Sequence, residues 1–300
     1  MGATSSDGAK LRTYHDAVVI VTGAGSGIGA ALGRGLATRG AHVVLADRDE
    51  EAARVETEQL VSGGARAEAT GLDVRDAEAV ERVVATAVAA HGRLDYLFNN
   101  AGIGVGGWVE DLSLEEDWRY SVEVNLMGPI HGIQAAYPRM VEQGFGHIVN
   151  TASMAAFMAT ALAAPYGATK HAVLGLSRAL RVEGAIRGVR VSVLCPGVVR
   201  TPILQDGGKY GRSPLTDLDA ETKMALWERL RPMAPDIFAA KALDAVARNR
   251  GLIIIPAWWR VLRLLNGLFP SLAEAAARRE LRRIGPLISK ASGDGPHAGE

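Results

Sequence analysis

Residues 17–29 read AVVIVTGAGSGIG, a short β-branched run followed directly by a glycine-rich turn that opens a helical pattern. Gly23, Gly27 and Gly29 let the backbone turn sharply and approach a pyrophosphate closely. The amides at the start of the following helix, and the positive end of its dipole, favour a phosphate there. Any tight turn uses glycine, but one that follows a strand and opens a helix predicts a dinucleotide-binding unit.

Outward from this turn, apolar runs of strand length alternate with helical patterns. Strands are expected at 17–22, 42–47, 66–72, 94–98, 147–151, 189–194 and 251–255, and helices at 27–39, 50–61 and 76–91. Strands that are apolar throughout and separated by crossover helices indicate a parallel sheet covered on both faces. We therefore predict a single-domain α/β Rossmann fold, a doubly wound parallel sheet of about seven strands, over residues 14–256.

Composition restricts the functional classes. Among 300 residues, 33 Lys and Arg balance 33 Asp and Glu, so no general attraction to nucleic acid is expected. The single cysteine, Cys195, excludes an internal disulfide framework and fits a reducing compartment. The seven histidines show no HxxxH or Cys/His pattern, so no metal site is predicted. Since the N-terminus lacks the apolar core of a signal peptide, the expected location is cytoplasmic.

Asp47 ends the second predicted strand and Arg48 follows it. A carboxylate at this position would accept hydrogen bonds from the adenosine ribose and repel a 2′-phosphate, which favours NAD over NADP. The guanidinium of Arg48 could instead accommodate that phosphate, although a solvated side chain is the simpler interpretation. NAD is therefore the expected cofactor, and NADP is the alternative.

Two further segments stand where strands of such a sheet end. Asp73 and Val74 follow the third apolar run, where an adenine ring would lie, while Asp76 is the better N-cap for the next helix. The sequence NNAG (99–102) ends the fourth strand, at the carboxyl edge where open sheets bind ligands. Because asparagine and glycine are also ordinary loop formers, this segment alone decides little.

The stretch 151–170, TASMAAFMATALAAPYGATK, carries the residues with catalytic chemistry. Tyr166 and Lys170 are one turn apart on a helix and share a face, and an ammonium beside a phenol favours the phenolate. A positive charge at about 4 Å contributes ~4 kcal/mol at an effective dielectric of about 20. Lowering a tyrosine pKa from about 10 toward neutrality needs ~3–4 kcal/mol, so Lys170 and an oxidised nicotinamide together would suffice. A lone tyrosine usually only packs, but this pair predicts an acid–base catalyst.

Taken together, these motifs resemble the short-chain dehydrogenase/reductase family. The matching segments occur in the family's order: TGAGSGIG (22–29), Asp47, LDV (72–74), NNAG (99–102), Asn125 in VNLMG, Ser153, YGATK (166–170) and PGVVRTP (196–202). The resemblance implies that Tyr166 is the catalytic acid/base, that Lys170 lowers its pKa and binds the nicotinamide ribose, and that Ser153 holds the substrate oxygen. It further implies that Asn125 supports a water chain from Lys170 to solvent.

The same resemblance implies the cofactor-binding residues. They are Gly23, Ser26, Gly27, Ile28, Gly29, Asp47, Arg48, Asp73, Val74, Asn100, Tyr166, Lys170, Pro196, Val199 and Thr201. Cys195, just before this last group, is expected to be a core residue and not a nucleophile.

The substrate wall is expected from residues 102–108, 154–165 and the stretch after Thr201. The second segment is almost wholly apolar, with Met154, Phe157, Met158 and Leu162. Such a lining suits a nonpolar secondary alcohol or ketone, although methionine is often simply core.

Residues 201–235, rich in glycine, proline and charge, resemble the family's mobile substrate lid. Lys209, Arg212 and Lys223 within it could contact an anionic group on a substrate, with a solvated surface as the favoured alternative.

Residues 257–288 extend past the last predicted strand as an amphipathic helical segment. One side is apolar (Trp258, Val261, Leu262, Leu264, Leu265, Leu268, Phe269) and the other carries Arg260, Arg263 and Asn266. The segment is too short and too charged to span a bilayer. Packing on the body or on a second subunit is favoured; closing the substrate pocket and peripheral membrane contact through 257–283 are the alternatives. Residues 1–13 are expected to be flexible and 289–300 disordered.

These observations predict a cytoplasmic NAD-dependent oxidoreductase that interconverts a hydrophobic secondary alcohol and its ketone. The resemblance implies a homo-oligomer, a dimer or tetramer. One alternative is an NADP-dependent carbonyl reductase, motivated by Arg48. The other is a catalytically silent nucleotide-sensing protein, against which the complete set of Tyr166, Lys170, Ser153 and Asn125 argues.

Overall fold

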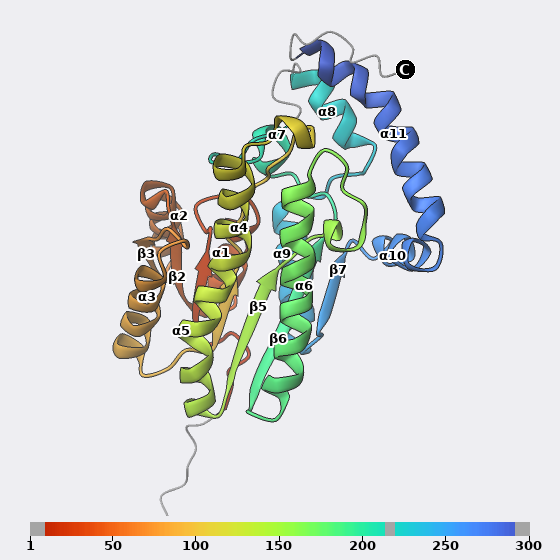
Figure 1. Ribbon diagram of the computed structural model, residues 1–300. Helices are drawn as coiled ribbons and strands as arrows, with labels where there is room; N and C mark the ends of the chain where they lie inside the picture. The colour runs from red at the N-terminus through yellow and green to blue at the C-terminus, as the bar shows by residue number, and fades with distance from the viewer. Residues whose placement is uncertain (1–9, 214–219, 292–300) are drawn as a thin grey trace, which may run out of the picture.

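The computed structural model describes residues 10–213 and 220–291. A seven-stranded parallel sheet in the order β3-β2-β1-β4-β5-β6-β7 forms its centre (Figure 1). The strands are β1 (Val18–Thr22), β2 (His42–Asp47), β3 (Arg66–Gly71), β4 (Tyr96–Asn99), β5 (Gly146–Thr151), β6 (Val189–Pro196) and β7 (Leu252–Ile255). The predicted fold class and all seven predicted strands are confirmed, with ends that differ by at most two residues.

Helices cover both faces of this sheet (Figure 1). They are α1 (Gly27–Ala37), α2 (Glu50–Ser62), α3 (Ala77–His91), α4 (Tyr120–Val122), α5 (Gly128–Gln143), α6 (Ala164–Ala185), α7 (Ile203–Asp206), α8 (Ala220–Glu228), α9 (Pro235–Ala247), α10 (Trp259–Leu268) and α11 (Pro270–Ala291). Asp76 caps α3, as expected, because its carboxylate accepts a hydrogen bond from the backbone amide of Ala79.

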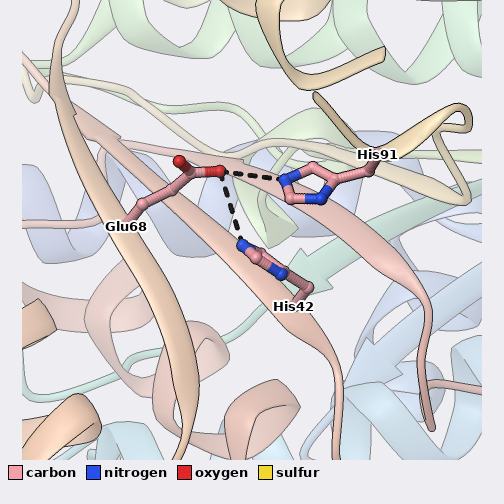
Figure 2. Close-up of side chains that lie close together, drawn as sticks. All are labelled: His42, Glu68 and His91. Atoms are coloured by element: carbon pink, nitrogen blue, oxygen red, sulfur yellow. Dashed lines mark hydrogen bonds and ion pairs between the residues drawn. The ribbon is translucent and has the colours of Figure 1, made fainter. Parts of the chain in front are cut away.

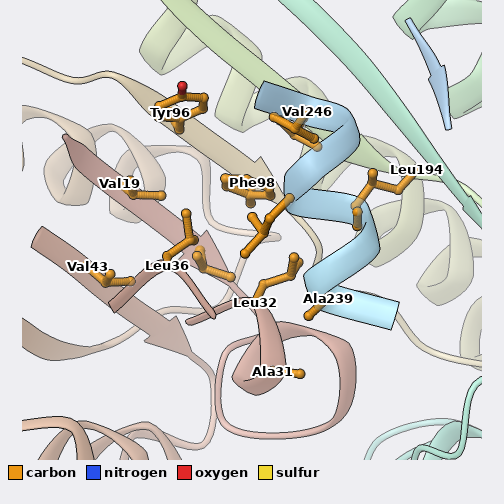
Figure 3. Packing of buried hydrophobic residues seen from close by; sticks show 14 of the residues in the cluster. Val19, Ala31, Leu32, Leu36, Val43, Tyr96, Phe98, Leu194, Ala239 and Val246 are labelled. Atoms are coloured by element: carbon orange, nitrogen blue, oxygen red, sulfur yellow. The ribbon is translucent and has the colours of Figure 1, made fainter. Parts of the chain in front are cut away.

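The core lies in two layers, one on each side of the sheet. Figure 3 shows the layer beneath α1 and α9, where Leu32 and Leu36 meet Phe98 of β4 and Val246 of α9. Each of these side chains is fully buried, and burying one leucine or phenylalanine contributes ~1.5–3 kcal/mol. The second layer packs α3, α5 and α6 against the opposite face. This packing fixes the strand ends from which the functional side chains project.

The strand order reverses between β1 and β4, which are parallel neighbours at the middle of the sheet. From β1 the chain proceeds outward to β2 and β3, and it then returns to β4 and continues the other way. The crossover connections therefore diverge at the carboxyl ends of β1 and β4. In open α/β sheets such a divergence leaves a crevice in which ligands bind.

The C-terminal extension forms two helices, but α10 presents the opposite face to the one expected. Trp259 is buried, Asn266 donates a hydrogen bond to the carbonyl of Phe157, and the guanidinium of Arg263 lies 5.1 Å from the Phe157 ring centre. Most of the apolar side is left exposed: Trp258, Val261, Leu264, Leu265, Leu268 and Phe269. The prediction that this side packs on the body is therefore wrong, and packing on a second subunit stays a prediction. An amphipathic pattern defines two faces without identifying the partner of either.

Within the described residues, no helix is long and apolar enough to cross a bilayer. Residues 1–9 and 292–300, which include most of the segments expected to be flexible or disordered, lie outside the described part of the chain. Residues 10–13 lie against the body, since the backbone amide of Arg12 donates to Asp95 at 3.1 Å.

Candidate active site

A cavity of about 850 Å³ opens at the carboxyl edge of the sheet. Nearly all the residues predicted from sequence line it: Gly23, Ser26, Gly27, Ile28, Asp47, Arg48, Asp73, Val74, Asn100, Ser153, Tyr166, Lys170, Pro196, Val199 and Thr201. The two exceptions, Gly29 and Asn125, do not line the cavity but adjoin residues that do: Gly29 lies against Gly23, and Asn125 is hydrogen-bonded to Ile103. Segments far apart in sequence therefore meet in one space, as the motif order predicted.

The glycine-rich turn leaves no room for side chains. Gly23 and Gly27 have φ values of 65° and 55°, which only glycine adopts without strain. A Cβ on Gly29 would lie 1.9 Å from the carbonyl oxygen of Gly23, and one on Gly23 would lie 2.7 Å from the Cα of Ala101. Ser26 precedes α1 without a side-chain capping bond, so the first-turn amides are left for an anion.

Asp47 is held by the turn that it faces. One carboxylate oxygen accepts from the amide of Gly25 at 2.8 Å and the other from the amide of Asp49 at 2.8 Å. These bonds fix the carboxylate at the end of β2, beside the glycine turn. The carboxylate is therefore an oriented acceptor, and its bond with a ribose hydroxyl stays a prediction.

Arg48 is not the simply solvated side chain that was preferred from sequence. Its guanidinium donates to the hydroxyl of Tyr120 at 3.0 Å and stacks 4.6 Å above the ring of Tyr210. Its Nε also lies 3.6 Å from the carboxylate of Asp73. A 2′-phosphate at this place would have to compete with these three partners.

Asp73 is held in its ionised form. Arg75 binds both of its carboxylate oxygens, at 2.6 to 3.0 Å. This hydrogen bonding keeps the pKa of Asp73 below its usual value.

The acid–base residues come together from β5 and α6. Ser153 follows β5, and its hydroxyl accepts from the amide of Ala155 at 3.1 Å. Tyr166 and Lys170 share the inner face of α6; the Lys170 amine lies 5.5 Å from the Tyr166 ring centre and donates to the carbonyl of Thr151 at 3.0 Å. The predicted one-turn spacing therefore produces a real neighbour pair.

Burial dominates the protonation of this pair. It raises the pKa of Tyr166, and the hydrogen bond with Ser153 lowers it only in part. Burial also lowers the pKa of Lys170 to about 8. In the protein alone, the Tyr166 pKa thus moves opposite to the sequence-based expectation, because desolvation penalises both the phenolate and the ammonium.

Asn125 is held by the loop that follows β4, close to Lys170. It is fully buried in a π-helical segment, Glu123–Met127, and its amide exchanges two hydrogen bonds with the backbone of Ile103, at 2.9 and 3.0 Å. A Cβ on Gly102 would stand 3.1 Å from its oxygen and 3.4 Å from the Lys170 amine. The missing side chain at Gly102 therefore leaves a space between Asn125 and Lys170, and π-bulges frequently mark functional sites.

Cys195 is a core residue, as expected. It is fully buried, and burial raises the pKa of its thiol to about 12. Next to it, Pro196 ends β6, and Thr201 packs against the glycine turn, 3.1 Å from where a Cβ on Gly27 would stand. Most of residues 196–201 thus line the cavity beside the glycine turn.

The substrate side is largely apolar and includes residues that the sequence did not point to. Met154, Met158 and Leu162 line the cavity as expected, whereas Phe157 packs beneath α10. Trp227 and Leu230 come from the stretch after Thr201, as expected, whereas the unanticipated lining residues come from the extension: Trp259, Ala277, Glu280, Leu281 and Ile284. The extension therefore closes the substrate pocket, one of the three alternatives left open for it.

Trp259 was not predicted to line the cavity, because the apolar side of the helix was drawn through Trp258 and not through Trp259. Its side chain is 5% exposed, and its indole nitrogen has no hydrogen-bond partner among the described residues. A Cβ on Gly197 would lie 2.1 Å from that nitrogen, so Gly197 makes room for the ring. The two adjacent tryptophans shortly after Pro256 were the only sequence feature that could have indicated a buried aromatic ring here.

Each of the three basic residues of the lid is paired with a carboxylate, although Lys209 and Arg212 also line the cavity. Lys209 pairs with Asp49, Arg212 with the buried Asp117 at 2.9 Å, and Lys223 with Asp206 at 2.9 Å. The first two ion pairs join the lid to the body, and the third lies within the lid. The alternative in which they bind an anionic group gains no support.

A model of the short chain dehydrogenase family matches residues 17–209. The chain belongs to this family. It is an oxidoreductase with the Rossmann-type NAD(P) fold of the short-chain dehydrogenases, and its relatives act on CH–OH groups.

Two curated relatives are named for alcohol substrates. The chain is 42% identical over 216 residues to 1-deoxy-11-beta-hydroxypentalenate dehydrogenase of Streptomyces exfoliatus, which covers 70% of this chain and 78% of that one. It is 36% identical over 194 residues to cyclohexanol dehydrogenase of Acinetobacter sp. (strain SE19), covering 64% and 77%.

Solved structures of this short-chain dehydrogenase fold hold either nucleotide. One from Burkholderia phymatum in complex with NAD superposes with a TM-score of 0.77 at 31% identity, over 87% of this chain and 96% of that one. A metagenomic short-chain oxidoreductase in complex with NADP gives 0.65 at 30% identity, over 81% and 98%. Similarity to these structures therefore does not distinguish NAD from NADP, and the preference has to be argued from the residues of this chain.

Proposed function

We propose that this short-chain dehydrogenase interconverts a hydrophobic secondary alcohol and its ketone, with NAD as cofactor. One observation carries the proposal: a single cavity joins the glycine turn, the Ser153–Tyr166–Lys170 group and an apolar wall. An apolar wall with a few convergent polar groups suits a nonpolar substrate with one reacting oxygen. The relatives named for cyclohexanol and a hydroxypentalenate agree with this class.

In this proposal the protein supplies positioning and proton transfer. When bound, the nicotinamide accepts or returns the hydride. Ser153 donates to the substrate oxygen and Tyr166 takes the hydroxyl proton during oxidation; the same groups run backward in reduction. Because burial raises the pKa of Tyr166, the positive charge of oxidised cofactor is needed beside the phenol to make it a base near neutrality.

Lys170 and Asn125 have positioning roles in the same scheme. The bond from the Lys170 amine to the Thr151 carbonyl fixes its position, and the space at Gly102 separates it from Asn125. A water in that space would pass the proton from the catalytic pair toward solvent. Asn125 would orient this water without touching the substrate.

NAD is proposed because Asp47 is oriented at the ribose position and Arg48 is already engaged. The test compares kcat/KM for NAD and NADP with one alcohol substrate. We expect NAD to be preferred by roughly tenfold or more, about 1.4 kcal/mol. A preference for NADP would establish the alternative, an NADP-dependent carbonyl reductase that uses Arg48.

A panel of secondary alcohols with NAD, followed by absorbance of the reduced cofactor, tests the reaction itself. Cyclic and branched alcohols are expected to turn over faster than polyols or phosphorylated alcohols. Binding of NAD without turnover of any alcohol or ketone would favour a silent nucleotide-sensing protein.

We further propose that α10 attaches the protein to a membrane surface. Its exposed apolar side chains, from Trp258 to Phe269, are accompanied by exposed arginines at 260, 278, 279 and 282. An apolar face beside basic residues is typical of helices that lie in the interface of anionic membranes.

Sedimentation with anionic phospholipid vesicles tests this attachment, using Leu265→Glu/Leu268→Glu and the wild type. We expect binding by the wild type and its loss in the double variant. Equal partitioning would dismiss the anchor. A wild-type dimer without lipid that the variant fails to form would assign the face to a second copy of the chain.

A further inference from the structure

A cluster of metal-binding side chains lies at the end of the sheet opposite the active site. His42 begins β2, Glu68 lies in β3 and His91 ends α3 (Figure 2). Because all strands are parallel, these amino-terminal strand positions are remote from the carboxyl edge that holds Tyr166. The reaction proposed above makes no use of them.

The three donor groups converge on one point. Figure 2 shows both imidazole rings directed at the same carboxylate oxygen of Glu68. That oxygen is 3.5 Å from Nε2 of His42 and 3.3 Å from Nε2 of His91, and the ring centres are 4.0 Å apart. One ligand atom from each residue lies within 4.8 Å of the other two.

These distances fit a shared cation better than two hydrogen bonds. Good N–H···O bonds centre near 2.9 to 3.0 Å, and both contacts are longer. Zinc bonds of about 2.0 to 2.2 Å in a tetrahedron place neighbouring ligand atoms about 3.3 to 3.5 Å apart. Two histidines and one glutamate also form a donor set that holds zinc in other proteins, with water as fourth ligand.

The surroundings permit a cation despite nearby arginines. The adjoining recess of about 220 Å³ is lined by Arg12, Arg66 and Arg93 as well as both histidines. Arg66 pairs with Asp16 at 2.6 Å, and Arg93 binds Asp95 at 2.7 Å; Arg12 donates to a backbone carbonyl at 2.6 Å. Asp16 and Asp95 therefore pair with two of the arginines, and a backbone carbonyl holds the third. Glu68 is left to the two histidines.

Ions can reach the cluster from solvent. The side chains of His42 and His91 are 25% and 21% exposed, and that of Glu68 is 49% exposed. The donors are therefore accessible, yet each is fixed by a strand or a helix end. A site built on regular elements holds its geometry before the ion arrives.

We propose that His42, Glu68 and His91 bind a divalent transition-metal ion, zinc foremost, with water as the fourth ligand. The ion would join β2, β3 and the end of α3, three elements that meet at the periphery of the sheet. It would stabilise the folded chain and leave hydride transfer unchanged.

Zinc alone is the probe, added to untagged protein in a buffer that sets the free ion concentration. We expect one Zn²⁺ per chain and a rise in Tm of about 5 °C at a hundredfold excess over Kd. Glu68→Gln and His91→Asn should weaken binding by more than about 100-fold, since even groups that only support a ligand cost roughly 10- to 100-fold.

His15→Gln is the matched control, because His15 lies nearby with its side chain 80% exposed. It should bind zinc like the wild type, and all variants should oxidise alcohols like the wild type. Equal binding by Glu68→Gln and wild type, or no binding by the wild type, overturns the proposal.

A second measurement covers variants that fail to fold. Co²⁺ bound to the wild type should give the intense visible bands of a four-coordinate site. Weak octahedral bands would mean that the cluster is only a pair of ion contacts, and they would overturn the proposal.

Discussion

The two edges of the sheet hold polar clusters that differ in how the chain builds them. At the carboxyl edge, Tyr166 and Lys170 are one helical turn apart, and the glycine turn is one continuous segment. At the amino edge, His42, Glu68 and His91 come from three separate elements. Local spacing can be read from a sequence, whereas convergence of distant elements needs the fold. The comparison predicts that substitutions at the carboxyl edge change catalysis and those at the amino edge change stability only.

Removing the phenol should produce the largest effect. Tyr166→Phe is expected to lower kcat by roughly 10²- to 10⁴-fold, the usual contribution of a positioned acid or base. NAD binding, followed by nucleotide fluorescence, should persist. Tyr14→Phe is the matched control, because the Tyr14 hydroxyl is buried at the amino edge and donates to the carbonyl of Leu243 at 2.7 Å.

The control should cost stability without changing kcat. Full activity in Tyr166→Phe would remove the acid–base assignment. A large loss of kcat in Tyr14→Phe would contradict the prediction that substitutions at the amino edge change stability only.

The pH dependence of alcohol oxidation should be set by Tyr166. Oxidation needs the deprotonated phenol, and burial raises its pKa. The kcat/KM for oxidation should therefore rise with pH, about tenfold per unit below the controlling pKa, whereas kcat/KM for ketone reduction should stay level there and fall above that pKa. Glu68→Gln should leave the profile unchanged, and an oxidation rate that falls as pH rises would contradict this assignment.

Two glycines with left-handed backbones allow a smaller, matched test. A Cβ added to Gly23 (φ 65°) would lie 2.7 Å from the Cα of Ala101, whereas one added to Gly64 (φ 83°), between α2 and β3, would have nothing within 4 Å. Alanine at either position should cost about 1–2 kcal/mol of stability from backbone strain, and Gly23→Ala should cost more because of the contact with Ala101. Only Gly23→Ala should also weaken NAD binding, by roughly tenfold, about 1.4 kcal/mol. Equal NAD affinity in both variants, measured by titration, would show that NAD binding does not depend on a close approach of the cofactor to the backbone at Gly23.

The smallest effect is expected at Trp259. Phenylalanine removes a buried N–H that has no partner among the described residues, so stability should change little. Because the ring lines the cavity, KM for the alcohol should change by a few-fold while kcat is kept. A change in kcat alone, without any change in KM, would place Trp259 outside substrate contact.

Sequence reasoning predicted the sheet, the glycine turn and the neighbouring Tyr166 and Lys170, because each follows from local periodicity. The environment of these residues did not follow. Burial raises the pKa of Tyr166, whereas a lowered pKa was expected. Trp259 is buried, so α10 turns a different face to the body from the one expected. Both effects depend on which elements surround a side chain, and no local pattern contains that information.

The placement of α11 over the cavity has a consequence for how this enzyme diversifies. Leu281 and Ile284 line the cavity, yet they follow β7 in the chain, beyond the strands of the described residues and every predicted cofactor-binding residue. Replacement of the final helix would reshape this part of the cavity wall and leave the predicted nucleotide-binding residues unchanged. Substrate preference can therefore be altered through the last helix independently of the residues assigned to hydride transfer.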